Sequence, residues 1–311
     1  MVWVINGGGD NMAYITVDGR NIYYEEYGAG LRPTLVYLHG GPGESCLTYS
    51  YQARKLGEHF HVISFDQYGV FRSDAIPEEE RAGVKFHVDL IDRMRIALGI
   101  KSWIPIGHSF GGMLACWYAY KYPASTDAVI YDCPMWSALH TARAMADVLY
   151  PYYVGRGNEE MADVCREILL TPISPREAFD KVMYLEIDDG AREFCHIIKM
   201  DAYYDYLDDH IEEPELPKAV REKYLTFARK LREEDDFYEN YLVYLKKIKK
   251  PQLLIVGEYD MTCGKPEQEW FCEHLRNGKM VTFANSAHLS WFEHPKLYTD
   301  TIVGFVEGIR K

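Results

Sequence analysis

The sequence lacks the marks of a secreted, membrane-embedded or nucleic-acid-binding protein. Seven of its 311 residues are cysteine. They are scattered and odd in number, which argues against a disulfide framework and favours reduced thiols in a cytoplasm. No apolar run reaches the roughly 20 residues of a membrane helix, and the first residues lack the basic and apolar regions of a signal peptide. The net charge of −13 argues against the basic face that nucleic acid or an anionic membrane requires. We therefore expect a cytoplasmic protein with neither of these as a partner.

The most informative stretch that is present is Gly107-His108-Ser109-Phe110-Gly111. It fits Gly-x-Ser-x-Gly, a pattern that places serine on a sharp turn between a strand and a helix. The apolar segment 103–106 predicts a strand before the turn, and the apolar segment 113–120 predicts a helix after it. Ser109 is therefore the predicted nucleophile, and His108 is expected to be its neighbour rather than a second base.

A glycine-rich loop, His39-Gly40-Gly41-Pro42-Gly43, follows a predicted strand at 34–38. Such a loop leaves backbone N–H groups that can face a developing oxyanion, and each donor is worth roughly 3–4 kcal/mol in the transition state. We predict that the N–H groups of Gly41 and Phe110 form this oxyanion hole. His39 is expected to brace the loop.

A catalytic triad on this type of turn runs in the chain order serine, acid, histidine. Asp260 comes just after a predicted strand at 252–256, at the end where open α/β sheets place their active sites. His288 follows the last predicted strand, 280–283. We predict that His288 takes the proton of Ser109 and that Asp260 orients His288.

Both choices have an alternative. Asp132 ends a predicted strand at 128–131 and is the alternative acid, although chain order favours Asp260. His294 stands beside Pro295 at a predicted helix start, which favours a surface position over a catalytic one. The sequence has no CxxC or HExxH spacing, so we expect neither a metal nor a cofactor.

These motifs make the chain resemble the proline iminopeptidases (prolyl aminopeptidases), a family of α/β-hydrolases. The shared segments occur in family order and are His39-Gly40-Gly41-Pro42-Gly43, Asp66-Gln67-Tyr68-Gly69 with Arg72-Ser73, Gly107-His108-Ser109-Phe110-Gly111-Gly112, Gly257-Glu258-Tyr259-Asp260 and the His288 segment. The resemblance implies an α/β-hydrolase fold, with a mostly parallel eight-stranded sheet flanked by helices and an inserted helical cap.

The chain departs from the family near the site. Tyr68 stands where the family commonly has arginine, and Val70-Phe71 replaces a common Cys-Gly. The glycine loop continues into Glu44-Ser45-Cys46 and not into further glycines. These changes bear on substrate identity more than on catalysis.

The domain organisation follows from where strand patterns stop. Strands alternate with helices over most of the chain, which predicts a mostly parallel sheet. Strand patterns end after Pro134 and resume at Gln252, and residues 134–240 contain 24 acidic against 13 basic residues. We predict a catalytic core of residues 1–133 and 246–311 and a helical cap of residues 134–245.

The cap is where the resemblance places the groups that bind the substrate. A carboxylate binds a free α-ammonium well through charge-assisted hydrogen bonds, and acidic cap residues have this role in the family. Asp201 matches a family glutamate, and Glu233 or Glu234 is a second candidate. Trp136 and Tyr204 are predicted to line the pocket for a flat ring.

We therefore expect a serine aminopeptidase that releases N-terminal proline, or another small apolar residue, from short peptides or amides with a free N-terminus. One alternative is a carboxylesterase or lactone hydrolase with the same triad and a pocket without an inward acid. Another is a non-catalytic ligand receptor, against which the complete triad argues. The sequence leaves the oligomeric state open, a homo-oligomer included.

Overall fold

The computed structural model describes residues 3–7, 10–185 and 218–310, and its described strands form a single nine-stranded sheet. The strand order is β1-β2-β3-β5-β4-β6-β7-β8-β9. The strands are β1 (Trp3–Gly7), β2 (Asp10–Val17), β3 (Arg20–Tyr27), β4 (Thr34–Leu38), β5 (His61–Phe65), β6 (Ile104–His108), β7 (Val129–Asp132), β8 (Gln252–Gly257) and β9 (Gly278–Phe283).

The pairing confirms the predicted mostly parallel sheet. From β5 through β4, β6, β7 and β8 to β9 every neighbouring pair is parallel. The pairs β1–β2, β2–β3 and β3–β5 are antiparallel. The resemblance implies an eight-stranded sheet, and the described sheet has one strand more, because β1 adds an edge strand that was not predicted. Parallel strands present their carboxyl ends at one edge, where the loops that carry the candidate site begin.

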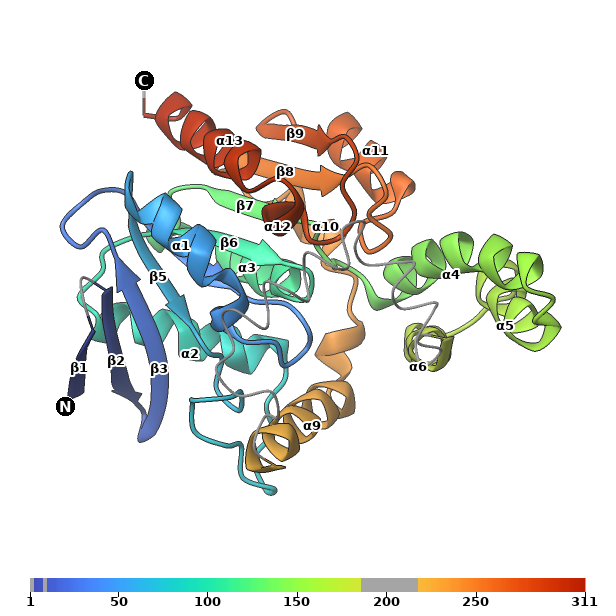
Figure 1. Ribbon diagram of the computed structural model, residues 1–311, viewed down its shortest axis with the longest axis horizontal. Coiled ribbons are helices and arrows are strands. Elements are labelled where there is room, and N and C mark those ends of the chain that lie inside the picture. Colours follow the sequence, from blue (N-terminus) through green and yellow to red (C-terminus); the bar gives the residue numbers. More distant parts are fainter. Residues whose placement is uncertain (1–2, 8–9, 186–217, 311) are drawn as a thin grey trace.

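Helices cover both faces of the sheet (Figure 1). Short 3₁₀ turns accompany them at Cys46–Tyr49, Pro123–Ser125 and Asp235–Tyr238. The described helices are α1 (Ser50–Gly57), α2 (Val84–Ala97), α3 (Gly111–Lys121), α4 (Ala138–Gly155), α5 (Glu159–Leu170), α6 (Pro175–Leu185), α9 (Lys218–Glu233), α10 (Leu242–Leu245), α11 (Lys265–His274), α12 (Ser290–Glu293) and α13 (Pro295–Gly308).

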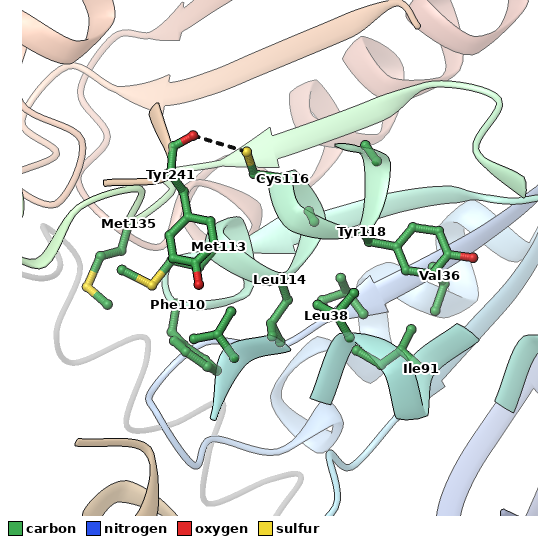
Figure 2. Close-up of a cluster of buried hydrophobic side chains, with 14 of the residues drawn as sticks. Val36, Leu38, Ile91, Phe110, Met113, Leu114, Cys116, Tyr118, Met135 and Tyr241 are labelled. Carbon is green, nitrogen blue, oxygen red and sulfur yellow. Dashed lines mark hydrogen bonds between the residues drawn. The ribbon is translucent and has the colours of Figure 1, made fainter. Parts of the chain in front are cut away.

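Two hydrophobic clusters follow from the alternation of side chains along the strands. In β4, Leu35 and Tyr37 join a cluster with residues of α1 and α13, whereas Val36 and Leu38 join a cluster with residues of α2 and α3. Figure 2 shows part of the second cluster, including the bond from the Cys116 thiol to the Tyr241 carbonyl at 3.4 Å. Because both faces are covered, the central strands β4 to β8 are buried along their whole length, as is typical of a parallel sheet.

Helices α4, α5 and α6 are inserted between β7 and β8 and lie beyond the carboxyl ends of the strands (Figure 1). They enclose a hydrophobic cluster of their own, which includes Ala146, Leu149, Cys165 and Val182. This is the predicted helical insertion. The domain limits at residues 133/134 and 245/246 stay a prediction. In the described part of the chain, no helix combines the length and the apolar character needed to cross a membrane.

Candidate active site

Ser109 lies at the sharp turn between β6 and α3, as the motif predicts. Its φ of +51° lies in the left-handed region, which a residue other than glycine adopts rarely and at a cost in backbone strain. Three backbone hydrogen bonds fix this conformation. The Ser109 N–H donates to the Asp132 carbonyl at 3.1 Å, and the Ser109 carbonyl accepts from the N–H groups of Gly112 and Met135, each at 2.8 Å. The turn therefore holds the predicted nucleophile in place before any substrate arrives.

The glycines around the serine allow the close packing of this turn. A Cβ atom on Gly107 would lie 2.3 Å from the Gly111 carbonyl oxygen, and one on Gly111 would lie 2.0 Å from the Leu38 carbonyl oxygen. Both contacts are with backbone, which cannot move aside without displacing the strand or the turn. The pattern Gly-x-Ser-x-Gly thus reflects a direct steric requirement.

The loop after β4 runs beside this turn and is braced by His39. The His39 Nδ1 bonds the Gly40 carbonyl at 3.1 Å, and its Nε2 accepts the Gln67 N–H at 3.0 Å. The Gln67 side chain donates to the His39 carbonyl at 2.9 Å. Burial lowers the pKa of His39, in keeping with a neutral ring whose two nitrogens have different roles. These bonds match the bracing role predicted for His39.

The predicted oxyanion donors lie on this loop and on the turn. Gly41 has a φ of +109° and is exposed, while Phe110 precedes the first residue of α3. Within the described residues neither N–H donates to a protein acceptor. Their role in an oxyanion hole stays a prediction.

The structure brings His288 and Asp260 together. The His288 Nδ1 lies 2.8 Å from the Asp260 Oδ1, and both side chains are buried. Asp260 also accepts from the backbone N–H groups of Thr262 at 3.2 Å and Cys263 at 3.0 Å. These bonds fix the orientation of the carboxylate so that it faces the imidazole. The His288 ring lies 4.8 Å, between centroids, from the ring of His108, which is the residue before Ser109.

A buried carboxylate that the sequence analysis did not identify fixes the loop that carries His288. Glu293, at the end of α12, accepts the Ser286 hydroxyl at 2.9 Å and the Ala287 N–H at 2.6 Å. These are the two residues immediately before His288. The position of the imidazole therefore depends on Glu293, which lies a short distance further along the chain.

The alternative acid, Asp132, is engaged elsewhere. Its carboxylate is fully buried and bonds His108 Nδ1 at 3.0 Å, the Ser290 hydroxyl at 2.6 Å and the Tyr298 hydroxyl at 3.4 Å. Burial by itself would lower the pKa of His108, but the adjacent Asp132 carboxylate outweighs it and the pKa is raised. Asp132 and His108 thus form a second acid–histidine pair beneath the turn. His294, the alternative base, bonds the Asn285 carbonyl through its Nε2 at 3.1 Å.

Cys133, Asp260 and His288 place a sulfur, an oxygen and a nitrogen within 4.8 Å of one another. Burial and the carboxylates of Asp260 and Asp132 raise the pKa of the Cys133 thiol well above its ordinary value. The thiol donates to the Ala287 carbonyl at 3.7 Å. Because the Asp260 carboxylate and the His288 imidazole are already bonded to each other, we assign no metal to these three side chains.

The predicted substrate-binding residues fall in different environments. Asp201 and Tyr204 lie outside the described residues. Glu233 is half-exposed and pairs with Arg229 at 2.6 Å, and Glu234 lies 3.3 Å from Arg81. Trp136 is fully buried and stacks on Phe271 with ring centroids 5.9 Å apart. Their proposed roles stay predictions, and the surroundings of Trp136 are those of a core residue.

Comparisons with known proteins agree with this architecture. The profile of the alpha/beta hydrolase fold family matches residues 33–160. The proline iminopeptidase of Saccharolobus solfataricus is 25% identical over an alignment of 313 positions. The alignment covers 95% of this chain and 92% of that protein. The proline iminopeptidase of Heyndrickxia coagulans is 25% identical over 95% of this chain and 98% of its own length. The solved proline iminopeptidase-related protein of Thermus thermophilus superimposes with a TM-score of 0.75 at 22% identity, covering 96% of this chain and 98% of that one.

Proposed function

We propose that this chain, which has the α/β-hydrolase fold and is related to the proline iminopeptidases at low identity, is a serine hydrolase acting through an acyl-enzyme on Ser109. The observation that carries the proposal is the position of the His288–Asp260 pair. Its imidazole lies against the residue that precedes a serine held in the left-handed conformation. Strain at such a residue is characteristic of active sites.

The proton transfers follow from the hydrogen bond to Asp260. Because Asp260 bonds the Nδ1 of His288, the Nε2 is the nitrogen that takes the proton of the Ser109 hydroxyl as its oxygen attacks the carbonyl carbon. The oxyanion that forms is stabilised by the N–H groups of Gly41 and Phe110. His288 then returns the proton to the leaving amine as the carbon–nitrogen bond breaks. Water, deprotonated by His288, then attacks the carbonyl carbon of the acyl-enzyme. The bond to the Ser109 oxygen breaks, His288 returns the proton to that oxygen, and the acid is released.

The finer activity we propose is that of an aminopeptidase acting on N-terminal proline or another small apolar residue. Full-length similarity to proteins named proline iminopeptidase and the shared loop motif support it. A helical insertion beyond the carboxyl ends of the strands would limit substrates to short peptides or amides.

The test compares kcat/KM for proline p-nitroanilide and N-acetylproline p-nitroanilide, with Ser109→Ala as the blank. A strong preference for the free amine, abolished in the blank, supports the aminopeptidase. Equal rates on both, or turnover of p-nitrophenyl esters alone, would support the esterase instead. Activity that persists in Ser109→Ala contradicts the serine-hydrolase mechanism.

A further inference from the structure

Glu44 places a carboxylate directly beside the candidate nucleophile. The loop after β4 turns back on itself, and the Glu44 N–H donates to the Gly40 carbonyl at 3.3 Å. A Cβ atom built on Gly40 would lie 3.0 Å from the Glu44 Oε2, 2.9 Å from the Ser109 Cβ and 3.1 Å from the His108 Cδ2. A carboxylate oxygen, the nucleophile's own carbon and the His108 ring thus meet around one point. The Glu44 carboxylate therefore lies close to Ser109.

No lysine or arginine side chain pairs with this carboxylate in the described part of the chain. Glu44 is half-buried, and its side chain accepts one long hydrogen bond, from the Thr48 hydroxyl at 3.4 Å. The two imidazoles nearest to it in the loop and the turn are committed. His39 bonds Gly40 and Gln67, and His108 bonds Asp132. A carboxylate with this one long bond can accept further charge-assisted hydrogen bonds from a cationic ligand.

Because Glu44 lies close to Ser109, a cationic group that binds Glu44 must lie close to the reacting carbonyl of the substrate. In the acyl-enzyme, the carbonyl carbon of the substrate is bonded to the Ser109 oxygen, so the atoms next to that carbonyl lie close to the Ser109 Cβ. A group that reaches Glu44 from there is attached to the first or second carbon beyond the carbonyl. An ammonium at this position would form a charge-assisted hydrogen bond with the Glu44 carboxylate. An acyl group with a negative charge there would be repelled.

We propose that Glu44 forms the subsite for the positively charged amino group on the acyl part of the substrate. The proposal rests on the proposed serine-hydrolase function of Ser109. It assigns recognition of the amino group to the loop after β4, whereas the resemblance to the proline iminopeptidases predicts carboxylates of the helical insertion for this role. This chain has Glu44 where the glycine loop could have continued with glycine, and a glycine there would have no carboxylate to bind an ammonium.

A matched pair of substrates separates the effect of the substrate's positive charge from the effect of its shape. Proline p-nitroanilide and cyclopentanecarboxylic acid p-nitroanilide have rings of the same size, and at neutral pH only the first carries an ammonium. We expect the wild type to prefer the proline compound in kcat/KM. Glu44→Gln should reduce that preference by at least tenfold. Glu58→Gln is the matched control, because Glu58 is exposed and pairs with Lys55 at 2.9 Å; it should keep the wild-type preference.

A binding measurement makes the test independent of anilide turnover. L-Prolinamide and cyclopentanecarboxamide are compared as protectors of Ser109 against a fluorophosphonate, in wild type and in Glu44→Gln, with thermal unfolding to confirm that the variant folds. Stronger protection by prolinamide, reduced at least tenfold in the variant, supports the proposal. If the two amides protect the wild type equally, or if Glu44→Gln leaves their ratio unchanged, the Glu44 assignment is wrong while the hydrolase function stands. If the fluorophosphonate does not label Ser109 at all, the proposed function itself fails.

Discussion

Nδ1 of His288 lies 2.8 Å from Oδ1 of Asp260, although the two residues are on separate loops that follow two different strands. Asp132, which ends β7 at the same edge of the sheet, bonds His108 and Ser290. The two carboxylates therefore have separable tasks, one orienting the predicted base and one holding the turn under Ser109.

Replacing each acid by its amide should distinguish these tasks. Asp260→Asn keeps the size of the side chain but no longer holds the His288 imidazolium, so kcat should fall on the order of 10³–10⁴-fold with little change in unfolding temperature. Asp132→Asn leaves a buried polar cluster unsatisfied, which should cost about 2–3 kcal/mol of stability and less than tenfold in kcat. Ester hydrolysis and thermal unfolding measure both. The reverse ranking in kcat would make Asp132 the catalytic acid.

The steric role of the turn glycines can be tested against a glycine with free space around it. A Cβ on Gly111 would lie 2.0 Å from a backbone oxygen, whereas one on Gly304, within α13, has nothing within 4 Å. Gly111→Ala should lose about 3 kcal/mol or more of stability, or fail to accumulate as folded protein. Gly304→Ala should gain about 0.5–1 kcal/mol through its helix propensity. Denaturant unfolding of the two variants gives the comparison, and equal stabilities would contradict it.

Glu293 should act on catalysis through the position of His288. Removing its carboxylate in Glu293→Ala frees the Ser286 hydroxyl and the Ala287 N–H, which it now holds at 2.9 and 2.6 Å. We expect kcat to fall about 10- to 100-fold, because small displacements of a catalytic group are costly, while KM changes little. Glu269→Ala, an exposed position in α11, is the control. A change confined to KM would place Glu293 in substrate binding instead.

Glu267 predicts a pH dependence of stability. It is almost fully buried, its Oε1 lies 3.4 Å from the His140 Nδ1, and burial raises the pKa of its carboxyl, although His140 acts in the opposite direction. A group whose pKa is higher in the folded state contributes stability that is fully present below its unfolded pKa and is lost as the pH rises through its folded pKa. Glu267→Gln has no ionisable group at this position, so the variant does not lose this stability as the pH rises. It should raise the Tm by a few degrees at pH 7–8, corresponding to about 1 kcal/mol, and much less near pH 4. A variant less stable than wild type at pH 7–8 would show that the ionised carboxylate is stabilising.

The features that sequence reasoning recovered are those encoded locally. The serine turn, the glycine loop and the strand-end positions of Asp260 and His288 follow from short patterns whose backbone conformations are set within a few residues. Strand β1 was not predicted, because the run of glycines at positions 7–9 in the sequence is typical of a loop. The hydrogen bond from Ser290 to Asp132 joins residues 158 positions apart in the sequence, and no local pattern predicts it. The position of Glu44 beside Ser109 was also beyond reach, since it depends on how two loops from different strands meet at the sheet edge.

The most direct test of the serine-hydrolase mechanism is fluorophosphonate labelling of the intact protein, with the modified residue located by peptide mass spectrometry. The mechanism predicts a single modification on Ser109, none in Ser109→Ala, and a labelling rate that drops at least 100-fold in His288→Ala. Labelling at another residue, or a rate on Ser109 that does not depend on His288, would contradict it.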